Sequence, residues 1–324
     1  MLRSLTVSAL LFAAAAATFA DTTEDRVRKS IPVQSATRFG LDVDFGSIQV
    51  VAGSSGTIEA EATFRGDPPS RREFDRMLKD FSFDVDRQGS GILIRGTFKG
   101  GWVSTGGLGW FDHGFCHDGK CLEYSRWLRH LEFRISVPAQ LAADLHTRGG
   151  SISVGDLKGE VNARTSGGSL QFGHIDGPVN GETSGGSISL SSGQGRAVLH
   201  TSGGSIHIEE VTGDVDATTS GGSIQISRTT GRVTAHTSGG SIAIGHAVNA
   251  VDASTSGGGI TVDMPSNAAF QLDASTSGGG VHSEFTVMGA VNGSNRQTLR
   301  GTVNGGGPLL HLRTSGGGIR IRRS

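Results

Sequence analysis

A repeat of 18 residues constrains this 324-residue chain more than any other feature of its sequence. The motif Thr-Ser-Gly-Gly-Ser, or a close variant, begins at seven positions spaced 18 residues apart: Thr147, Thr165, Thr183, Thr201, Thr219, Thr237 and Thr255. Two looser copies follow at Thr276, after 21 residues, and at Thr314, after a further 38. The last interval is about two repeat lengths, so we expect the copy at Thr314 to lie about two turns beyond Thr276. A regular period of this kind indicates units that stack on one another.

Within each unit, apolar residues alternate with polar ones at two fixed places. Counting the Thr as position one, positions six and eight are apolar, as in Ile206 and Ile208, and so are positions fifteen and seventeen, as in Val215 and Ala217. A period of two is typical of a strand with one buried face. One unit cannot bury both stripes, whereas units stacked about 4.8 Å apart bury them and pair their backbones. The repeat therefore predicts an all-β fold, a single-stranded parallel β-helix or β-solenoid with 18-residue coils.

Glycine accounts for 52 residues, many of them in pairs between the two expected strands. We expect pairs such as Gly203 and Gly204 to form sharp turns, in which the absence of a Cβ permits positive φ. The neighbouring Thr and Ser are expected to form hydroxyl ladders between coils or to bond their own backbone. A phosphate-binding loop would need a following helix and usually a Lys. A calcium-binding nonapeptide would need Gly-Gly-x-Gly-x-Asp, which this repeat does not contain.

Three regions follow from this pattern: a leader over 1–20, a β-rich capping region over 21–140, and the solenoid repeats over 141–324. In the capping region, residues 45–50 and 57–63 alternate like the repeat strands and predict early coils or capping strands.

A helix is predicted over 67–80, because its apolar residues lie on one face and Ser70 or Asp67 can serve as the N-cap. The alternating runs 81–85 and 92–98 are joined by turn-forming residues and predict a hairpin. One further strand is predicted over 130–137.

Residues 1–20 have the layout of a secretory signal peptide. Arg3 precedes an apolar run that ends in small residues, and a polar segment begins at Asp21. The run is too short for a stable membrane span, and no later apolar run approaches that length. We expect an exported mature chain that begins near Asp21, has no transmembrane segment, and is located in the periplasm, on the cell surface or outside the cell. An uncleaved anchor is the alternative.

Residues 99–129 form a Gly-rich stretch that predicts a long loop. This stretch contains all the Trp, Tyr and Cys residues of the chain: Trp102, Trp110, Trp127, Tyr124, Cys116 and Cys121. In an exported protein, two Cys this close most simply form a local disulfide. The alternatives are free thiols and a zinc site that adds His113 and His117, although the spacing matches no standard zinc site. The aromatic residues either contact a glycan or protein partner or simply close one end or side of the solenoid, and the second interpretation is favoured.

Charge and motif content limit the possible functions. Lys and Arg total 29 against 30 Asp and Glu, so a general attraction to nucleic acid or anionic lipid is not supported. His146, His200 and His236 precede the motif Thr in three units, but other units have Arg, Glu or Thr there, so this column is interpreted as a variable, solvent-facing position. No nucleophile, zinc-protease or paired-acid motif is present. We therefore expect no catalytic residue, no metal and no cofactor.

The chain resembles a bacterial family described as "putative adhesins", a domain of unknown function with a Gly/Ser/Thr-rich parallel β-solenoid. The resemblance lies in the strand that ends at Val137 and Pro138, the segment 141–154, the repeated Thr-Ser-Gly-Gly-Ser-Ile, and the closing residues 313–321. It spans roughly residue 31 to the C-terminus and implies the same fold. No catalytic residue carries over, and the stretch 99–129 departs from the family's pattern.

These observations lead to a functional expectation: a non-catalytic exported envelope or surface protein whose rigid solenoid mediates adhesion or envelope interaction. The partner is left open between a cell-wall or surface glycan and an envelope protein, and nucleic acid is not expected. The alternatives are a glycan-active β-helix enzyme, with its site beside residues 99–129, and a self-assembling structural element of the envelope.

Overall fold

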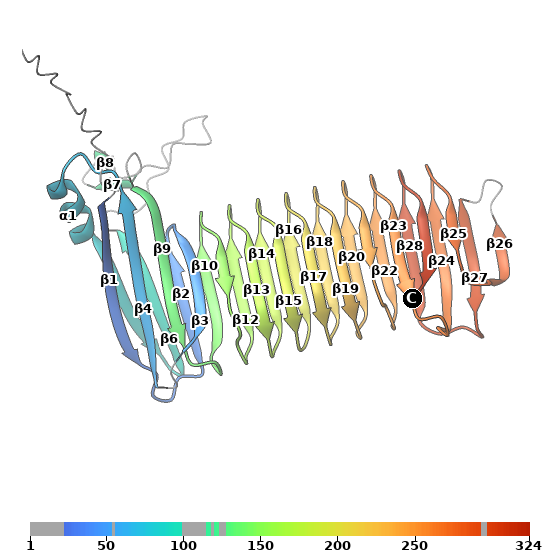
Figure 1. Cartoon of the computed structure of the whole chain (residues 1–324), viewed down its shortest axis with the longest axis horizontal. Coiled ribbons are helices and arrows are strands. Elements are labelled where there is room, and N and C mark those ends of the chain that lie inside the picture. Colours follow the sequence, from blue (N-terminus) through green and yellow to red (C-terminus); the bar gives the residue numbers. More distant parts are fainter. Residues whose placement is uncertain (1–22, 54–55, 99–114, 118–119, 123–127, 293–296) are drawn as a thin grey trace, which may run out of the picture.

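A computed structural model describes residues 23–53, 56–98, 115–117, 120–122, 128–292 and 297–324. Two long β-sheets run the length of an elongated molecule, and each coil of the solenoid contributes one strand to each sheet (Figure 1). The predicted all-β parallel solenoid is confirmed. Among the described residues the one helix is α1 (Arg71–Asp80), and no helix has the length and apolar character needed to span a membrane.

In both sheets the spatial order of the strands starts at the N-terminal end of the molecule. Sheet A contains β1 (Thr23–Pro32), β4 (Thr57–Gly66), β9 (Leu128–Val137), β3 (Ser47–Ala52), β11 (Ile152–Val154), β13 (Leu170–Ile175), β15 (Ile188–Gly193), β17 (Ile206–Val211), β19 (Ile224–Thr229), β21 (Ile242–Ile244), β23 (Ile260–Met264), β29 (Ile319–Arg323) and β25 (Val281–Ser283). Sheet B contains β5 (Phe81–Gln88), β6 (Gly91–Phe98), β2 (Arg38–Val43), β10 (Ala142–Thr147), β12 (Val161–Thr165), β14 (Val179–Thr183), β16 (Ala197–Thr201), β18 (Val215–Thr219), β20 (Val233–Thr237), β22 (Val251–Thr255), β28 (Leu309–Thr314), β24 (Phe270–Thr276), β27 (Thr298–Val303) and β26 (Met288–Asn292). A separate hairpin consists of β7 (Phe115–His117) and β8 (Lys120–Leu122).

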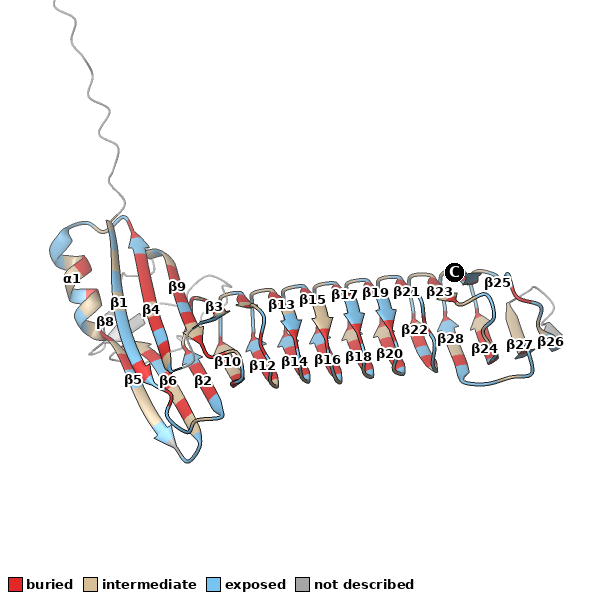
Figure 2. Cartoon of the chain, turned by 60° about the horizontal axis from the view of Figure 1, so that its bottom comes forward, coloured by how far each residue is buried: buried red, intermediate tan, exposed pale blue. Residues whose placement is uncertain are grey.

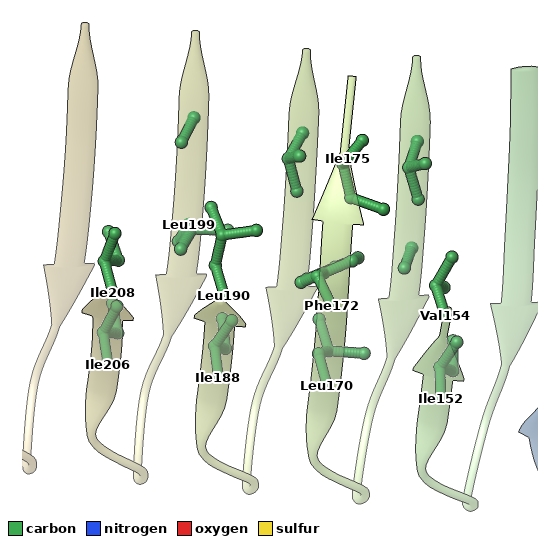
Figure 3. Packing of buried hydrophobic residues seen from close by; sticks show 14 of the residues in the cluster. Ile152, Val154, Leu170, Phe172, Ile175, Ile188, Leu190, Leu199, Ile206 and Ile208 are labelled. Atoms are coloured by element: carbon green, nitrogen blue, oxygen red, sulfur yellow. The ribbon is translucent and has the colours of Figure 1, made fainter. Parts of the chain in front are cut away.

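The core lies between the two sheets and is built from stacked rows of like residues (Figure 3). Strands 18 residues apart pair in parallel and in register, so Ile188 lies directly between Leu170 and Ile206. Both predicted apolar stripes are buried. Position eleven of the repeat is also buried, as Ile175 and Val211 show. The two apolar stripes predicted from the sequence do not include this position. The coil therefore closes around five buried apolar rows, at positions six, eight, eleven, fifteen and seventeen.

Hydroxyl ladders run along one edge of the solenoid, as predicted. The buried Thr201 donates its Oγ1 hydrogen to the carbonyl of Gly186 in the preceding coil (2.7 Å) and accepts from the Gly204 N–H (3.3 Å). The Ser205 N–H donates to Oγ of Ser187, one coil earlier (3.1 Å). The same bonds recur from coil to coil, so the polar turn atoms are satisfied by neighbouring coils.

The paired glycines correct one expectation. Among the described residues, the glycines with positive φ do not include Gly203 or Gly204. The reason for the second glycine is crowding between coils, because a Cβ on Gly204 would overlap the carbonyl group of Gly186. Stacking at the β-strand spacing leaves no room for a side chain at this point of the turn.

The N-terminal cap replaces parallel coils by antiparallel strands. β4 pairs antiparallel with β1 and β9, and β5 pairs antiparallel with β6. The expected early coil is formed by β2 and β3, which pair in parallel with β10 and β11. Helix α1 begins at Arg71 rather than at residue 67, because Ser70 is extended and its Oγ caps the Glu73 N–H (3.3 Å). Phe74 and Met77 on its inner face are fully buried.

The last coil is out of sequence order. β28 lies between β22 and β24, and β29 lies between β23 and β25. Thr314 pairs with Thr255 on one side and with Thr276 on the other, so the expectation that its coil lies two turns beyond Thr276 is wrong. The far edge of β24 is occupied by the antiparallel strand β27, which prevents a parallel coil from continuing there. The chain instead returns to fill a position that it had left open after Met264.

Candidate ligand-binding groove

A groove with a volume of about 1060 Å³ lies on the outer face of sheet B, where the cap meets the first coils. Its walls come from β6, β2, β10, β12, β14 and β16. Figure 2 shows the long cap strands inclined to the axis of the solenoid next to these coils. The groove thus lies at the junction of two differently oriented parts of one continuous sheet.

Two columns of outward side chains enter this groove from the repeat. Positions fifteen and seventeen are buried, so the intervening position sixteen and the following position eighteen face outward. In register across the sheet, the first column contains Leu93, Gly40, Asp144, Asn162, Asn180 and Val198. The second column contains Asp42, His146, Arg164, Glu182 and His200.

The first column contains a continuous hydrogen-bonded row, which we call the amide ladder. The Asn180 amide N–H donates to the side-chain oxygen of Asn162 (2.7 Å), and the Asn162 amide N–H donates to Asp144 Oδ1 (2.7 Å). Arg38 donates to the other Asp144 oxygen (3.2 Å) and to Glu160 (2.8 Å). These bonds orient the amides, and each amide has further donor and acceptor capacity for a ligand.

The second column is ionic. Arg164 donates through Nε (2.8 Å) and approaches through Nη2 (2.7 Å) the same oxygen of Glu182. His146 and His200 flank this pair in register. Because both charged side chains are largely exposed, the pair adds little stability but fixes the shape of the groove wall.

Aliphatic surface completes the groove near the cap. A Cβ on Gly40 would lie 2.9 Å from Cδ1 of Leu93, so the side chain of Leu93 lies across the face of β2 at Gly40. Val198 supplies a second half-buried aliphatic surface at the other end of the amide ladder.

The combination of oriented amides, paired charges and aliphatic patches determines which ligands fit. Positive charges from Arg38 and Arg164 are set against the carboxylates of Asp42, Asp144 and Glu182, so the groove has no excess of cations for a phosphate backbone. Fixed hydrogen-bonding groups beside apolar surface suit a polyhydroxylated ligand, which offers hydroxyls to the former and C–H faces to the latter.

A His–Asp pair lies outside this groove, at β13. The His174 backbone N–H donates to Asp156 Oδ1 (3.0 Å), and the His174 ring nitrogen Nδ1 lies 3.1 Å from the same oxygen. These bonds hold the pKa of Asp156 below its usual value. An exposed carboxylate kept ionised in this way is suited to a surface ion pair rather than to acid catalysis. No cluster of three or more metal-ligating side chains occurs in the described part of the chain.

The aromatic and cysteine residues predicted from the sequence are not among the described residues that line this groove. Trp102, Trp110, Tyr124 and Trp127 lie outside the described residues, as does the leader 1–20. The backbones of Cys116 and Cys121 lie directly opposite each other in the β7–β8 hairpin. Opposed antiparallel residues have Cα atoms about 4.5–5.5 Å apart, within the range of a disulfide, so the predicted Cys116–Cys121 bond stays a prediction that this register permits.

The groove itself was missed by reasoning from the sequence, which treated the His column as variable surface. His200 is exposed, and His146 and His200 are separated by β12 and β14, so they form no common ligand set. One feature of the sequence could have indicated the groove. Position sixteen of the repeat is Asp or Asn in three successive units (Asp144, Asn162 and Asn180), and the next unit has Val198 there.

Comparisons with known proteins give likenesses of fold. No family model matches the chain, and no curated protein matches it. It is similar to a solved "putative adhesin" from Parabacteroides merdae, with 13% identity, 91% of this chain and 95% of that chain covered, and a TM-score of 0.45. A "putative adhesin" from Bacteroides fragilis shows 12% identity, coverage of 92% and 97%, and a TM-score of 0.39. A "putative lipid binding protein" from Parabacteroides distasonis shows 12% identity, coverage of 92% and 96%, and a TM-score of 0.42. Similarity at this level carries no argument about function.

Proposed function

We propose that this chain is an exported, non-catalytic, adhesin-like protein that binds an extended surface or cell-wall glycan in the groove of sheet B. The observation that carries the proposal is the amide ladder of Asn180, Asn162 and Asp144, held in the wall of the groove. Export rests on the leader predicted over 1–20.

Preorganisation supports binding at this place. The ladder residues stand on β10, β12 and β14, whose backbones are fixed on both sides by parallel pairing. A ligand therefore meets side chains that are already oriented, and little conformational entropy is lost in ordering them. Successive coils are separated by the spacing of paired β-strands, so equivalent side chains lie about 4.8 Å apart. Such a regular array suits a chain-like ligand.

Carboxylate placement favours binding over cleavage. Glycoside hydrolysis requires two carboxyl groups that flank one bond. Asp144 accepts hydrogen bonds from Arg38 and Asn162. Glu182 accepts hydrogen bonds from Arg164, and it lies two coils away from Asp144, in the other column. Both carboxylates are thus engaged by the protein and do not face each other. The glycan-active enzyme remains the alternative, because residues 99–114 and 123–127 lie outside the described part.

Edge protection disfavours the self-assembling alternative. Sheet A begins with the charged antiparallel strand β1, and sheet B ends in the antiparallel hairpin of β27 and β26. Charged and antiparallel terminal strands hinder end-to-end stacking of parallel coils.

The test measures co-sedimentation of the mature chain, starting at residue 21, with isolated cell-wall and outer-membrane fractions. Replacing both ladder amides, Asn162→Ala with Asn180→Ala, is expected to weaken binding about thirtyfold, since each lost hydrogen bond is worth about 1 kcal/mol.

The matched control is Thr234→Ala with Asp252→Ala, which alters the same repeat position on the same face beyond the groove. Equal loss in the two double variants, with unchanged circular dichroism, would refute the groove as the site. A variant lacking residues 101–124 serves as the other arm, because loss of binding there alone would assign recognition to the aromatic stretch.

A further inference from the structure

The position occupied by the last coil is a two-strand slot whose walls precede it in the chain. In sheet B, β28 pairs in parallel with β22 and β24, and in sheet A, β29 pairs in parallel with β23 and β25. All four neighbouring strands are therefore made before the residues that fill the slot. Until then, two sheets present unpaired edges on both sides of a gap one coil wide, and open edges of this kind are templates for β-pairing.

Hydroxyl contacts make the slot specific for this segment. Thr314 donates to the Gly258 carbonyl on one wall (2.7 Å), and Thr276 of the other wall donates to the Gly317 carbonyl (2.7 Å). The Thr ladder therefore runs unbroken through the inserted coil, and the crowding at Gly317 requires a glycine at that place in the turn.

Charge and apolar contacts add to this specificity. Arg322 binds both carboxylate oxygens of Asp263 (2.7 Å each), and the Arg323 N–H donates to Glu284 on the opposite wall (2.9 Å). The apolar side chains that the segment inserts between the walls are all fully buried: Leu310, Leu312, Ile319 and Ile321. A segment of other sequence would leave the carboxylate of Asp263 and this core without partners.

The segment is joined to the preceding strand β27 by a short connection. It follows a glycine-rich connection in which Asn304, Gly305 and Gly306 have positive φ (50°, 87° and 86°), and Asn304 and Gly305 are exposed. Ser324 is exposed at the surface of the solenoid (Figure 1).

We propose that the slot accepts residues 309–324 of a second copy of this chain, so that two copies join by exchanging their last coils. Every contact described above lies between the slot and the segment, and none depends on which copy supplies the segment. Reciprocal exchange fills both slots, so it closes at two copies, and only the connection 304–308 changes its path. Such a pair would carry two sheet-B grooves.

A disulfide across the slot distinguishes exchange from a closed single chain. In the mature full chain with Cys116→Ser and Cys121→Ser, Asp252→Cys and His311→Cys are register partners across β22 and β28. The matched control is Asp216→Cys with Thr234→Cys, register partners at the same repeat position within the continuous solenoid. Adjacent strands lie about 4.8 Å apart, within disulfide range. Each protein is refolded at two concentrations and oxidised, and its mass is read on a non-reducing gel.

Exchange predicts a covalent dimer for the slot pair, whose yield rises about tenfold when the protein concentration is raised about tenfold, because partner insertion competes with self-insertion. The control pair is expected to give monomer only. Monomer alone from both pairs at every concentration, or equal dimer from both, overturns the proposal. If the first pair prevents folding, Thr261→Cys with Arg320→Cys tests the same slot in sheet A, against Gln225→Cys with Ala243→Cys.

Discussion

At the scale of single residues, the motif Thr is the polar group on which the stacking of coils depends. Thr201 is fully buried, and its hydroxyl links two coils by donating to Gly186 and accepting from Gly204. A buried hydroxyl with both roles filled satisfies a carbonyl and an amide that no strand partner reaches. The hydroxyl ladders are predictable from the repeat. Which group each hydroxyl donates to and which it accepts from depends on how the turn crosses from one coil to the next.

Replacing Thr201 by Val keeps the shape of the side chain and removes both hydrogen bonds. The expected loss is about 2 kcal/mol of unfolding free energy, because the half-buried Gly186 carbonyl and Gly204 amide both lose their hydrogen-bond partner. Urea unfolding followed by circular dichroism measures the change. Ser202→Ala, at the exposed neighbour, is the control and should stay within about 0.5 kcal/mol. Equal effects of the two substitutions would contradict this role.

At the scale of the element, the spacing between coils decides which turn residues are tolerated. The two glycines of each turn have different surroundings, although the sequence does not distinguish them. A Cβ on Gly203 would lie 3.1 Å from the Gly185 carbonyl oxygen, whereas a Cβ on Gly204 would overlap the Gly186 backbone. The first contact requires a small adjustment of the turn, and the second requires the coils to separate.

Gly204→Ala is therefore expected to destabilise the protein by about 3 kcal/mol or more, because two backbones must move apart and disrupt strand pairing on both sides. Gly203→Ala is the matched control and should cost about 1 kcal/mol or less. Thermal and urea unfolding of the two variants provide the comparison. A larger loss for the Gly203 variant would show that backbone conformation, rather than crowding, sets the need for glycine.

At the scale of the whole molecule, strand pairing among the described residues holds the cap to the solenoid. β6 is fixed between β2 and β5, and β9 is fixed between β3 and β4. The aromatic core of the cap is formed within these elements, as the edge contacts of Phe81 with Phe64 (5.0 Å) and Phe98 (5.3 Å) show.

Deleting residues 101–124 should leave the far-ultraviolet circular dichroism and the urea midpoint close to those of the full mature chain. Deleting 309–324 is the contrasting variant, because it removes two buried strands and exposes four sheet edges. We expect the second deletion to lose β-sheet signal or to aggregate. Loss of β-sheet signal in the first deletion would instead make the stretch an integral part of the cap.

The repeat determined the elements, the two main buried stripes, the hydroxyl ladders and the parallel register, because each of these depends on contacts between units 18 residues apart. The helix, with Ser70 as one of its two candidate N-caps, and the hairpin of β5 and β6 were likewise readable, since caps and turns are local. The position of the last coil was not, because a Thr-Ser-Gly-Gly-Gly coil fits against any other coil. Only the antiparallel β27 on the far edge of β24 excluded the expected order.

The groove also depended on the tertiary structure. Asp144, Asn162 and Asn180 could be placed on one face from the sequence, yet the hollow beside them is also lined by Leu93 of the cap, which lies across Gly40. That contact joins segments far apart in the chain, and no local or periodic pattern encodes it. Repetition thus specified the scaffold, while the junction with the cap and the return of the C-terminal segment were decided by which sheet edges the folded chain left open.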